Sequence, residues 1–136
     1  VIGAVLIPGA AAPRLVTREM VRDMADGTAM VDISIDHGGC FETSRPTTHD
    51  APTYVEEGVV HYCVTNMPGA VARTATLALN NVTVPYVVEL AEQGWEKSFR
   101  AIEGFAAGLN VHDGAIMHPQ VAAALDLPLV TYPCAA

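Results

Sequence analysis

Two polar side chains follow apolar runs of the chain and could do chemistry. Asp36 comes directly after the run at residues 30–35 and before a glycine doublet at 38–39, and Asn66 follows the run at residues 59–64. A carboxylate can orient a reacting molecule or exchange a proton with it, and an amide both donates and accepts hydrogen bonds. If the runs are neighbouring parallel strands, both side chains lie at the sheet edge where α/β proteins bind ligands.

Both residues also fit a purely structural role. Asp36 could close its loop by accepting hydrogen bonds from the backbone N–H groups of Gly38 and Gly39, and Asn66 could form a turn before Pro68. The sequence leaves these alternatives open. Their placement after successive strand candidates favours a shared ligand site.

The remaining chemistry-bearing residues form no recognisable site. The five histidines include no pair four residues apart, and no dinucleotide-binding or P-loop glycine motif is present. Cys40, Cys63 and Cys134 are far apart and without CxxC spacing, so we expect no disulfide framework and no metal site. We expect Cys40 to be a buried, inert thiol, and Arg45 either to be solvated or to pair with an anion.

Apolar runs and turn residues predict the elements that position Asp36 and Asn66. In chain order we expect a strand at 1–7, a helix at 18–25 capped by Thr17, a strand at 30–35, a long loop at 36–58 and a strand at 59–64. Because the run at 1–7 is apolar on both faces, it is typical of an interior parallel strand. Pro46 and Pro52 favour irregular structure in the loop. This order predicts an α/β fold containing half of a doubly wound sheet.

A long helix should follow at residues 70–93 and stop at Gly94. Its length would be on the order of 35 Å, more than a small domain needs, so we expect it to cross between domains. Pro85 should kink it. We then expect a helix from 95 to about 106, a hairpin around residues 113–114 and a helix at 119–125.

Composition excludes several classes of partner. The net charge of −8 opposes the counterion release that drives nucleic-acid binding, and no apolar stretch approaches the roughly 20 residues of a membrane helix. With cysteines that suggest a reducing environment, the chain fits a cytoplasmic protein. Hydrophobic residues make up 51% of the chain, which is more apolar surface than so small a domain usually buries. We therefore expect part of this surface to contact a partner. Because Val1 lies inside a predicted strand, we expect further residues to precede it.

Six stretches closely resemble bacterial NAD-dependent alanine dehydrogenases. They are VDISIDHGGCFE at 31–42, SRPTT at 44–48, YCVTNMPGAV at 62–71, TLALNN at 76–81, PYV at 85–87 and AGLN at 107–110. The resemblance implies reversible oxidative deamination of L-alanine to pyruvate and ammonia with NAD as cofactor, in a homo-oligomer that is usually a hexamer.

The same resemblance implies a division of the chain into three parts. Residues 1–69 would be the later part of a doubly wound, Rossmann-type NAD-binding domain, residues 70–94 a connecting helix, and residues 95–136 the C-terminal return into a substrate domain. The family's catalytic lysine and histidine, its substrate arginine and its glycine-rich phosphate turn would belong to a portion preceding Val1. This chain would therefore need that N-terminal portion as its partner and be inactive alone.

Roles for individual residues also follow from the resemblance. Asp36 matches the active-site aspartate, and Asn66 matches an asparagine that lies between the nicotinamide and the substrate. His37 stands where many relatives are expected to have glutamine. The implied cofactor contacts are Val5, Leu6, Leu15, Ile33, Ser34, Ile35, Asp36, Val64, Thr65, Asn66 and Met67.

Two other functions remain open. A nucleotide-binding component of a proton-translocating NAD(P) transhydrogenase would share the fold but pass hydride to another subunit. The stretches at 44–48 and 66–68 favour the dehydrogenase. A noncatalytic remnant that only binds a partner is the third hypothesis.

Overall fold

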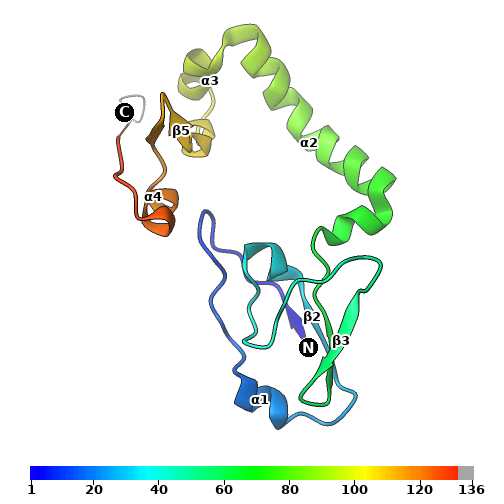
Figure 1. Cartoon of the computed structure of the whole chain (residues 1–136). Helices are drawn as coiled ribbons and strands as arrows, with labels where there is room; N and C mark the ends of the chain where they lie inside the picture. Colours follow the sequence, from blue (N-terminus) through cyan, green and yellow to red (C-terminus); the bar gives the residue numbers. More distant parts are fainter. Residues whose placement is uncertain (132–136) are drawn as a thin grey trace. The chain divides into compact units, whose positions relative to one another are not determined.

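A computed structural model describes residues 1–131, which form parts of two compact units, Val1–Ala70 and Val71–Ala136 (Figure 1). Each unit is described by itself below. Cys134 lies outside the described residues. Within the first unit the elements alternate between strands and a helix, which confirms the α/β class predicted from the sequence.

The first unit contains a four-stranded sheet with the order β1-β2-β4-β3. Its strands are β1 (Ile2–Gly3), β2 (Ala29–Asp32), β3 (Thr53–Glu56) and β4 (Val59–Tyr62), and the helix α1 (Arg18–Arg22) lies between β1 and β2 in sequence. The pairs β1–β2 and β2–β4 are parallel, whereas β3 pairs with β4 in antiparallel fashion. The expected parallel arrangement of the three apolar runs is therefore confirmed.

The strand expected over residues 1–7 is shorter than predicted, and its interior position stays a prediction. Only Ile2–Gly3 pairs in a ladder, as β1 beside β2. Beyond Gly3 the chain is held by a side chain instead of a strand ladder: the Val5 N–H donates to Ser34 Oγ at 2.6 Å, and Ser34 Oγ donates to the Val5 carbonyl at 2.9 Å. These bonds replace the pairing that a longer strand would need.

The strand predicted at 30–35 also ends early. β2 stops at Asp32, and a 3₁₀ helix, η1 (Ile33–His37), follows. The physical reason is a cap: the Asp32 carboxylate accepts a hydrogen bond from the Ser34 N–H at 3.0 Å, which turns the chain out of the extended conformation. Gly38, with φ 94°, ends the turn. Asp36 thus lies in a helical turn and not at a strand end.

The long loop predicted at 36–58 contains a strand that the sequence interpretation missed. β3 and β4 form a hairpin in which Glu56 pairs with Val59. The two residues between them, Glu57 and Gly58, have φ values of 52° and 76°, as tight hairpin turns require. β4 itself ends at Tyr62, two residues before the predicted end at 64.

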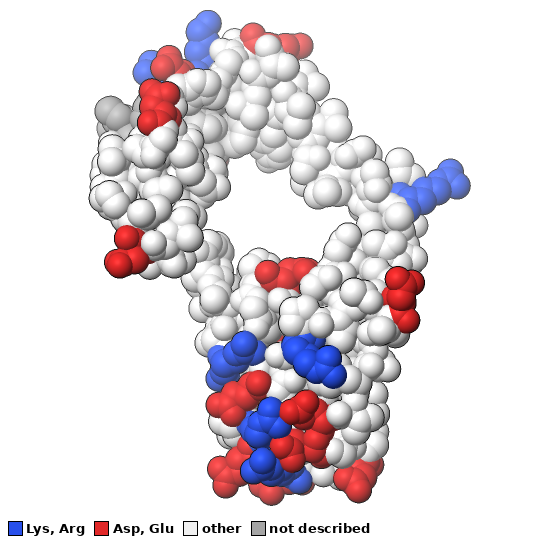
Figure 2. Space-filling view, viewed as in Figure 1, with Lys and Arg blue, Asp and Glu red and all other residues white. Residues whose placement is uncertain are grey.

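Helix α1 and the hairpin turn are joined by ion pairs. Arg18 Nη1 lies 2.6 Å from Glu56 and 2.7 Å from Glu57, and Arg22 Nε lies 3.0 Å from Glu57. Figure 2 shows these opposite charges gathered on one face of the unit. The hydrogen bonds from Arg22 and Arg18 lower the pKa of Glu57, and those to Glu57 and Glu56 raise the pKa of Arg18. Thr17 caps α1 as expected, but the helix ends at Arg22.

The core of the first unit is small. Its fully or nearly fully buried members are Val21 of α1, Met30 of β2, Cys40, Phe41 and Val59 of β4. Gly3 belongs to this packing, because a Cβ there would overlap Cys40 and Phe41. Cys40 and Phe41, which follow η1, therefore pack between α1 and the sheet.

The second unit is mainly helical. It contains α2 (Ala72–Gln93), α3 (Trp95–Ala101), the 3₁₀ helix η3 (Phe105–Gly108), β5 (Val111–His112), β6 (Ala115–Ile116) and α4 (Pro119–Leu125). A short 3₁₀ helix, η2 (Met67–Val71), precedes α2. The long helix, the hairpin around residues 113–114 and the last helix are confirmed. The helix expected to reach about residue 106 ends at Ala101.

Apolar side chains surround α2 and remain exposed. Leu77, Leu79, Val82 and Val87 are 54–65% exposed and point in different directions around the axis. Pro85 lies inside the helix, and the kink expected there stays a prediction. The division of the chain into parts 1–69, 70–94 and 95–136 also stays a prediction. Among residues 1–131, no helix combines the length and the apolar character needed to cross a bilayer.

Candidate functional site

Asp36 and Asn66 are in direct contact. The backbone nitrogen of Asn66 lies 3.3 Å from Asp36 Oδ1 and 3.4 Å from Oδ2, so one N–H group faces both carboxylate oxygens. Both residues are exposed to solvent. The prediction that they share one place in the fold is confirmed. The contact is made by the Asn66 backbone, which leaves its side chain available for a ligand.

The turn that carries Asn66 has an unusual backbone conformation. Asn66 has a φ of 52°, in the left-handed region, which asparagine tolerates better than most residues. Its carbonyl accepts a hydrogen bond from the Gly69 N–H at 2.9 Å and faces His49 Nε2 at 3.1 Å. Since a carbonyl only accepts, His49 donates. Sequence reasoning assigned His49 no role, and no local spacing links residues 49 and 66.

A second residue missed from the sequence is Asp32, whose side chain is completely buried. Its carboxylate accepts from the Ser34 N–H at 3.0 Å, the Cys40 N–H at 2.8 Å and the Ser44 hydroxyl at 2.5 Å, and Cys40 Sγ lies 3.4 Å away. These bonds tie both ends of the segment carrying Asp36 to the end of β2. The only signal in the sequence was the aspartate itself, because aspartate side chains often bind the backbone N–H two residues further on.

The glycine doublet at 38–39 allows the chain to pass close to Asp32. Gly39 has a φ of 80°, and a Cβ atom there would lie 2.9 Å from Asp32 Oδ2 and 2.9 Å from Ser44 Cβ. A side chain at this position would therefore be strained and would crowd the carboxylate. The alternative in which Asp36 accepts from the Gly38 and Gly39 N–H groups is wrong, because these groups donate to the backbone carbonyls of Ile35 and Ser34 in η1.

A pocket of about 210 Å³ opens beside η1. It is lined by Ala4, Val5, Leu6, Ile33, Ser34 and His37. Four of these residues are among the predicted cofactor contacts. Its walls are mostly apolar, with one hydroxyl and one imidazole, which suits a flat aromatic ring carrying a small polar group.

The other predicted cofactor residues are arranged differently. Ile35 and Val64 are buried, so only their backbone groups could face a ligand. Thr65 and Met67 are half-buried on either side of Asn66, whereas Leu15 is 57% exposed and does not line the pocket. The structure thus brings together most of the set around η1 and the Asn66 turn, and leaves Leu15 apart.

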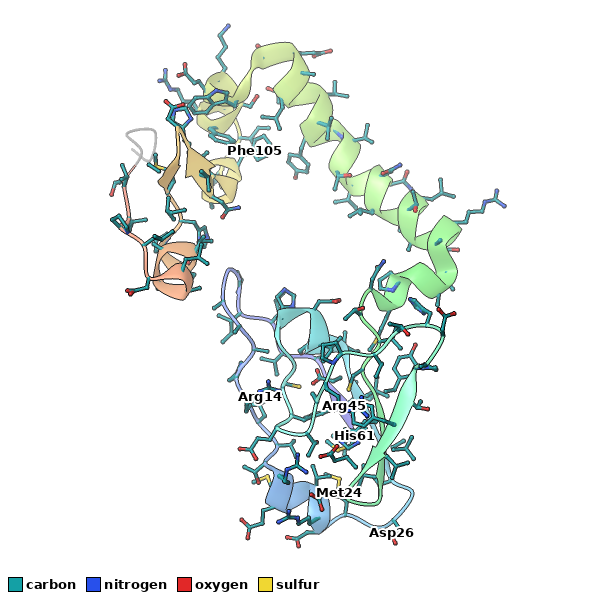
Figure 3. The ribbon with its side chains drawn as sticks, viewed as in Figure 1. Arg14, Met24, Asp26, Arg45, His61 and Phe105 are labelled. Atoms are coloured by element: carbon teal, nitrogen blue, oxygen red, sulfur yellow. The ribbon has the colours of Figure 1, made fainter. Side chains whose placement is uncertain are left out.

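Arg45 makes a contact that the sequence did not suggest. Its guanidinium carbon lies 3.8 Å from the centre of the Tyr54 ring, which stacks on buried His61 at a centroid distance of 5.0 Å (Figure 3). The His61 ring bonds to the Thr43 hydroxyl at 2.8 Å and donates to the Val59 carbonyl at 3.0 Å. These contacts fix the segment between η1 and β3 on the sheet.

Cys40 fits the expectation of an inert thiol. It is completely buried, and burial together with the nearby Asp32 charge raises its pKa. Both effects disfavour the reactive thiolate. Among the described residues, no group of three or more histidine, cysteine, aspartate or glutamate side chains is arranged to hold a metal ion.

Comparison with known proteins places this geometry in context. Residues 1–119 match the family model described as "Alanine dehydrogenase/PNT, C-terminal domain". The chain is 62% identical over 130 residues to an alanine dehydrogenase of Halomonas elongata, covering 96% of this chain and 35% of that protein. It is 56% identical over 128 residues to one of Mycolicibacterium smegmatis, covering 94% and 34%. The chain thus spans about a third of the length of these relatives.

Two solved structures are similar to the chain. An L-alanine dehydrogenase structure matches with a TM-score of 0.74 and 52% identity, covering 92% of this chain and 34% of the other. A transhydrogenase from Sinorhizobium meliloti matches with a TM-score of 0.58 and 32% identity, covering 87% and 31%. Both identity and structural similarity are higher for the first.

Proposed function

Since the chain belongs to the alanine dehydrogenase/PNT C-terminal domain family, we propose that it is part of an enzyme that oxidises L-alanine to pyruvate and ammonia, reversibly and with NAD. Identities of 62% and 56% to proteins named alanine dehydrogenase support this reaction. Because the chain spans about a third of those proteins, the remaining two thirds would supply the other catalytic groups. The proposed whole enzyme is a cytoplasmic homo-oligomer, a hexamer by the resemblance stated above.

The observation that carries the proposal is the contact between Asp36 and the Asn66 turn. It brings two residues that are both exposed to solvent within hydrogen-bond distance of each other. Oxidation of an amino acid passes through an imine that water must then hydrolyse, so proton transfer is needed next to the reacting carbon. Asp36 would orient that water or take its proton.

The pocket beside η1 fits the nicotinamide end of the cofactor. Val5, Leu6 and Ile33 would cover the faces and edge of a flat ring, and His37 would lie at its rim. When bound, NAD supplies the acceptor for the hydride that leaves the alanine Cα. Ser34 bonds to both backbone polar groups of Val5 and so holds one wall of the pocket against η1.

Asn66 would hold the substrate beside this ring. Its side-chain amide can donate to a carboxylate or carbonyl oxygen of alanine or pyruvate and accept from an amino group. The backbone N–H of Asn66 meanwhile holds the Asp36 carboxylate. Binding and orientation of this kind lower the barrier because the reacting atoms no longer need to find one another.

A transhydrogenase component is the second candidate function, supported by the weaker structural match at 32% identity. The two candidates differ in their electron donor. A dehydrogenase reduces NAD with L-alanine, whereas a transhydrogenase exchanges hydride between two nicotinamide nucleotides and does not need an amino acid.

The test is an assay of the full-length enzyme that contains this chain. We expect NADH to form when L-alanine is added and to be consumed when pyruvate and ammonium are added together. Hydride exchange between NADH and an oxidised NADP analogue, without turnover of alanine, would favour the transhydrogenase. Neither activity in a folded preparation that fails to bind NADH by calorimetry would favour the noncatalytic remnant.

A further inference from the structure

We propose that His49 is a positioning residue for Asp36, acting through the backbone of Asn66. His49 Nε2 donates to the Asn66 carbonyl at 3.1 Å, while the Asn66 N–H donates to the Asp36 carboxylate at 3.3 Å. The two polar groups of one residue are thus held from opposite sides. The expected loss of activity rests on the proposed function, whereas the expected change in geometry does not.

The backbone of Asn66 needs such support because its conformation is costly. A residue other than glycine in the left-handed region is held there only when its surroundings compensate for the strain, which is of order 1 kcal/mol. Asn66, with a φ of 52°, receives this support through its carbonyl, which binds both His49 and the Gly69 N–H. In this conformation its N–H faces the Asp36 carboxylate.

Gly69 leaves the space that this arrangement requires. A Cβ atom at position 69 would lie 3.3 Å from His49 Nε2 and 3.3 Å from Asn66 Nδ2. Both distances are tighter than ordinary contacts, so a side chain there would displace the imidazole or the amide. The His49 ring and the Asn66 side-chain amide therefore both lie close to Gly69.

The segment that carries His49 is itself anchored beside the Asn66 turn. Thr47 forms a parallel bridge with Val64, in which the Thr47 N–H donates to the Cys63 carbonyl at 2.9 Å and the Thr65 N–H donates to the Thr47 carbonyl at 3.1 Å. Thr47 Oγ1 also donates to the Pro52 carbonyl. The backbone at Thr47, two residues before His49, is thus held by the bridge to Val64. From there the His49 side chain reaches the Asn66 carbonyl, in the turn that follows Val64.

Two substitutions of similar length separate the hydrogen bond from the bulk of the side chain. In the full-length enzyme, His49→Gln keeps an N–H donor, and His49→Met does not. We expect His49→Met to lower kcat by about tenfold to a hundredfold, the effect of misplacing a catalytic group by an ångström or less. His49→Gln should retain kcat within about threefold, and KM for L-alanine should change less than kcat in both variants.

Crystal structures of the two variants provide a readout that does not depend on activity. In His49→Met we expect the Asn66 carbonyl to turn and its N–H to leave hydrogen-bond distance of Asp36; in His49→Gln we expect the contact to remain. Equal kcat values for the two variants, or an unchanged Asn66 contact in His49→Met, would overturn the proposal. If the wild-type enzyme proves inactive on alanine while the geometry changes as expected, the proposed function fails and the positioning role stands.

Discussion

The N–H of Asn66 bonds to the carboxylate of Asp36, thirty residues earlier in the chain. This bond links the turn after β4 to the 3₁₀ helix after β2, two elements that the parallel pairing of β2 and β4 brings side by side. A carboxylate held in this way has a defined direction although it is exposed. The contact therefore joins η1 and the Asn66 turn in one candidate site.

The role of Asp36 can be tested by Asp36→Asn in the full-length enzyme. The amide is nearly the same size but is not a base, so we expect kcat for alanine oxidation to fall by at least about a hundredfold, as is usual on loss of a general base. NADH affinity, measured by fluorescence titration, should change less than kcat. Asp23→Asn, at the end of α1, is the matched control and should have wild-type kinetics. Retention of turnover by Asp36→Asn would remove the residue from the mechanism.

Replacement of Asp32 should lower the stability of the folded protein. Asp32→Asn directs an amide N–H group toward backbone and hydroxyl donors that now bind a carboxylate oxygen. We expect the free energy of unfolding to fall by about 2 kcal/mol or more, the cost of leaving buried polar groups unpaired. Urea unfolding of the full-length protein, followed by tryptophan fluorescence and circular dichroism, measures this. A loss no larger than that of Asp23→Asn would contradict the buried network.

Two glycines with the same backbone angle separate strain from crowding. Gly39 and Gly27 both have a φ of 80°, but a Cβ at Gly39 would lie 2.9 Å from Asp32 Oδ2, whereas one at Gly27 would meet nothing within 4 Å. Each alanine substitution carries a strain of order 1 kcal/mol. We therefore expect Gly39→Ala to be clearly more destabilising than Gly27→Ala in urea unfolding. Equal effects would mean that close packing against Asp32 contributes nothing.

The ion pairs of Glu57 predict a pH dependence of stability. Because Arg22 and Arg18 lower the pKa of folded Glu57, its contribution is present above the unfolded pKa and is lost as the pH falls through the folded value. Glu57→Gln should therefore reduce the loss of stability on acidification below about pH 4.5, near the usual glutamate pKa. Urea midpoints measured across this range test it, with Glu92→Gln on α2 as the control. Identical pH profiles for wild type and Glu57→Gln would contradict the prediction.

Hydrophobic runs and turn residues predicted much of the fold. They identified the parallel strands around Met30 and Val59, the Thr17 cap, the long helix ending before Gly94 and the hairpin at residues 113–114. These features depend on neighbours in sequence, so a local pattern reveals them. Resemblance to known dehydrogenases added the family, which the match over residues 1–119 then established.

Two of the wrong expectations involve side chains that bind backbone groups distant in sequence. Residues 4–7 leave the sheet where Ser34 binds Val5, and β2 ends at Asp32, whose carboxylate also binds Cys40 and Ser44. The strand β3 was missed because the glutamate in its turn is a weaker hairpin signal than asparagine or aspartate.

Hydrophobic patterns alone predicted that Asp36 and Asn66 follow neighbouring parallel strands and lie close together at one edge of a sheet. Only the tertiary structure showed that they meet through the Asn66 backbone, that Asp32 holds the turn beneath Asp36, and that His49 supports the Asn66 carbonyl. The physical reason is that strand order follows from local hydrophobic patterns. Hydrogen bonds between loops depend on distances of a few tenths of an ångström between residues that no sequence spacing connects.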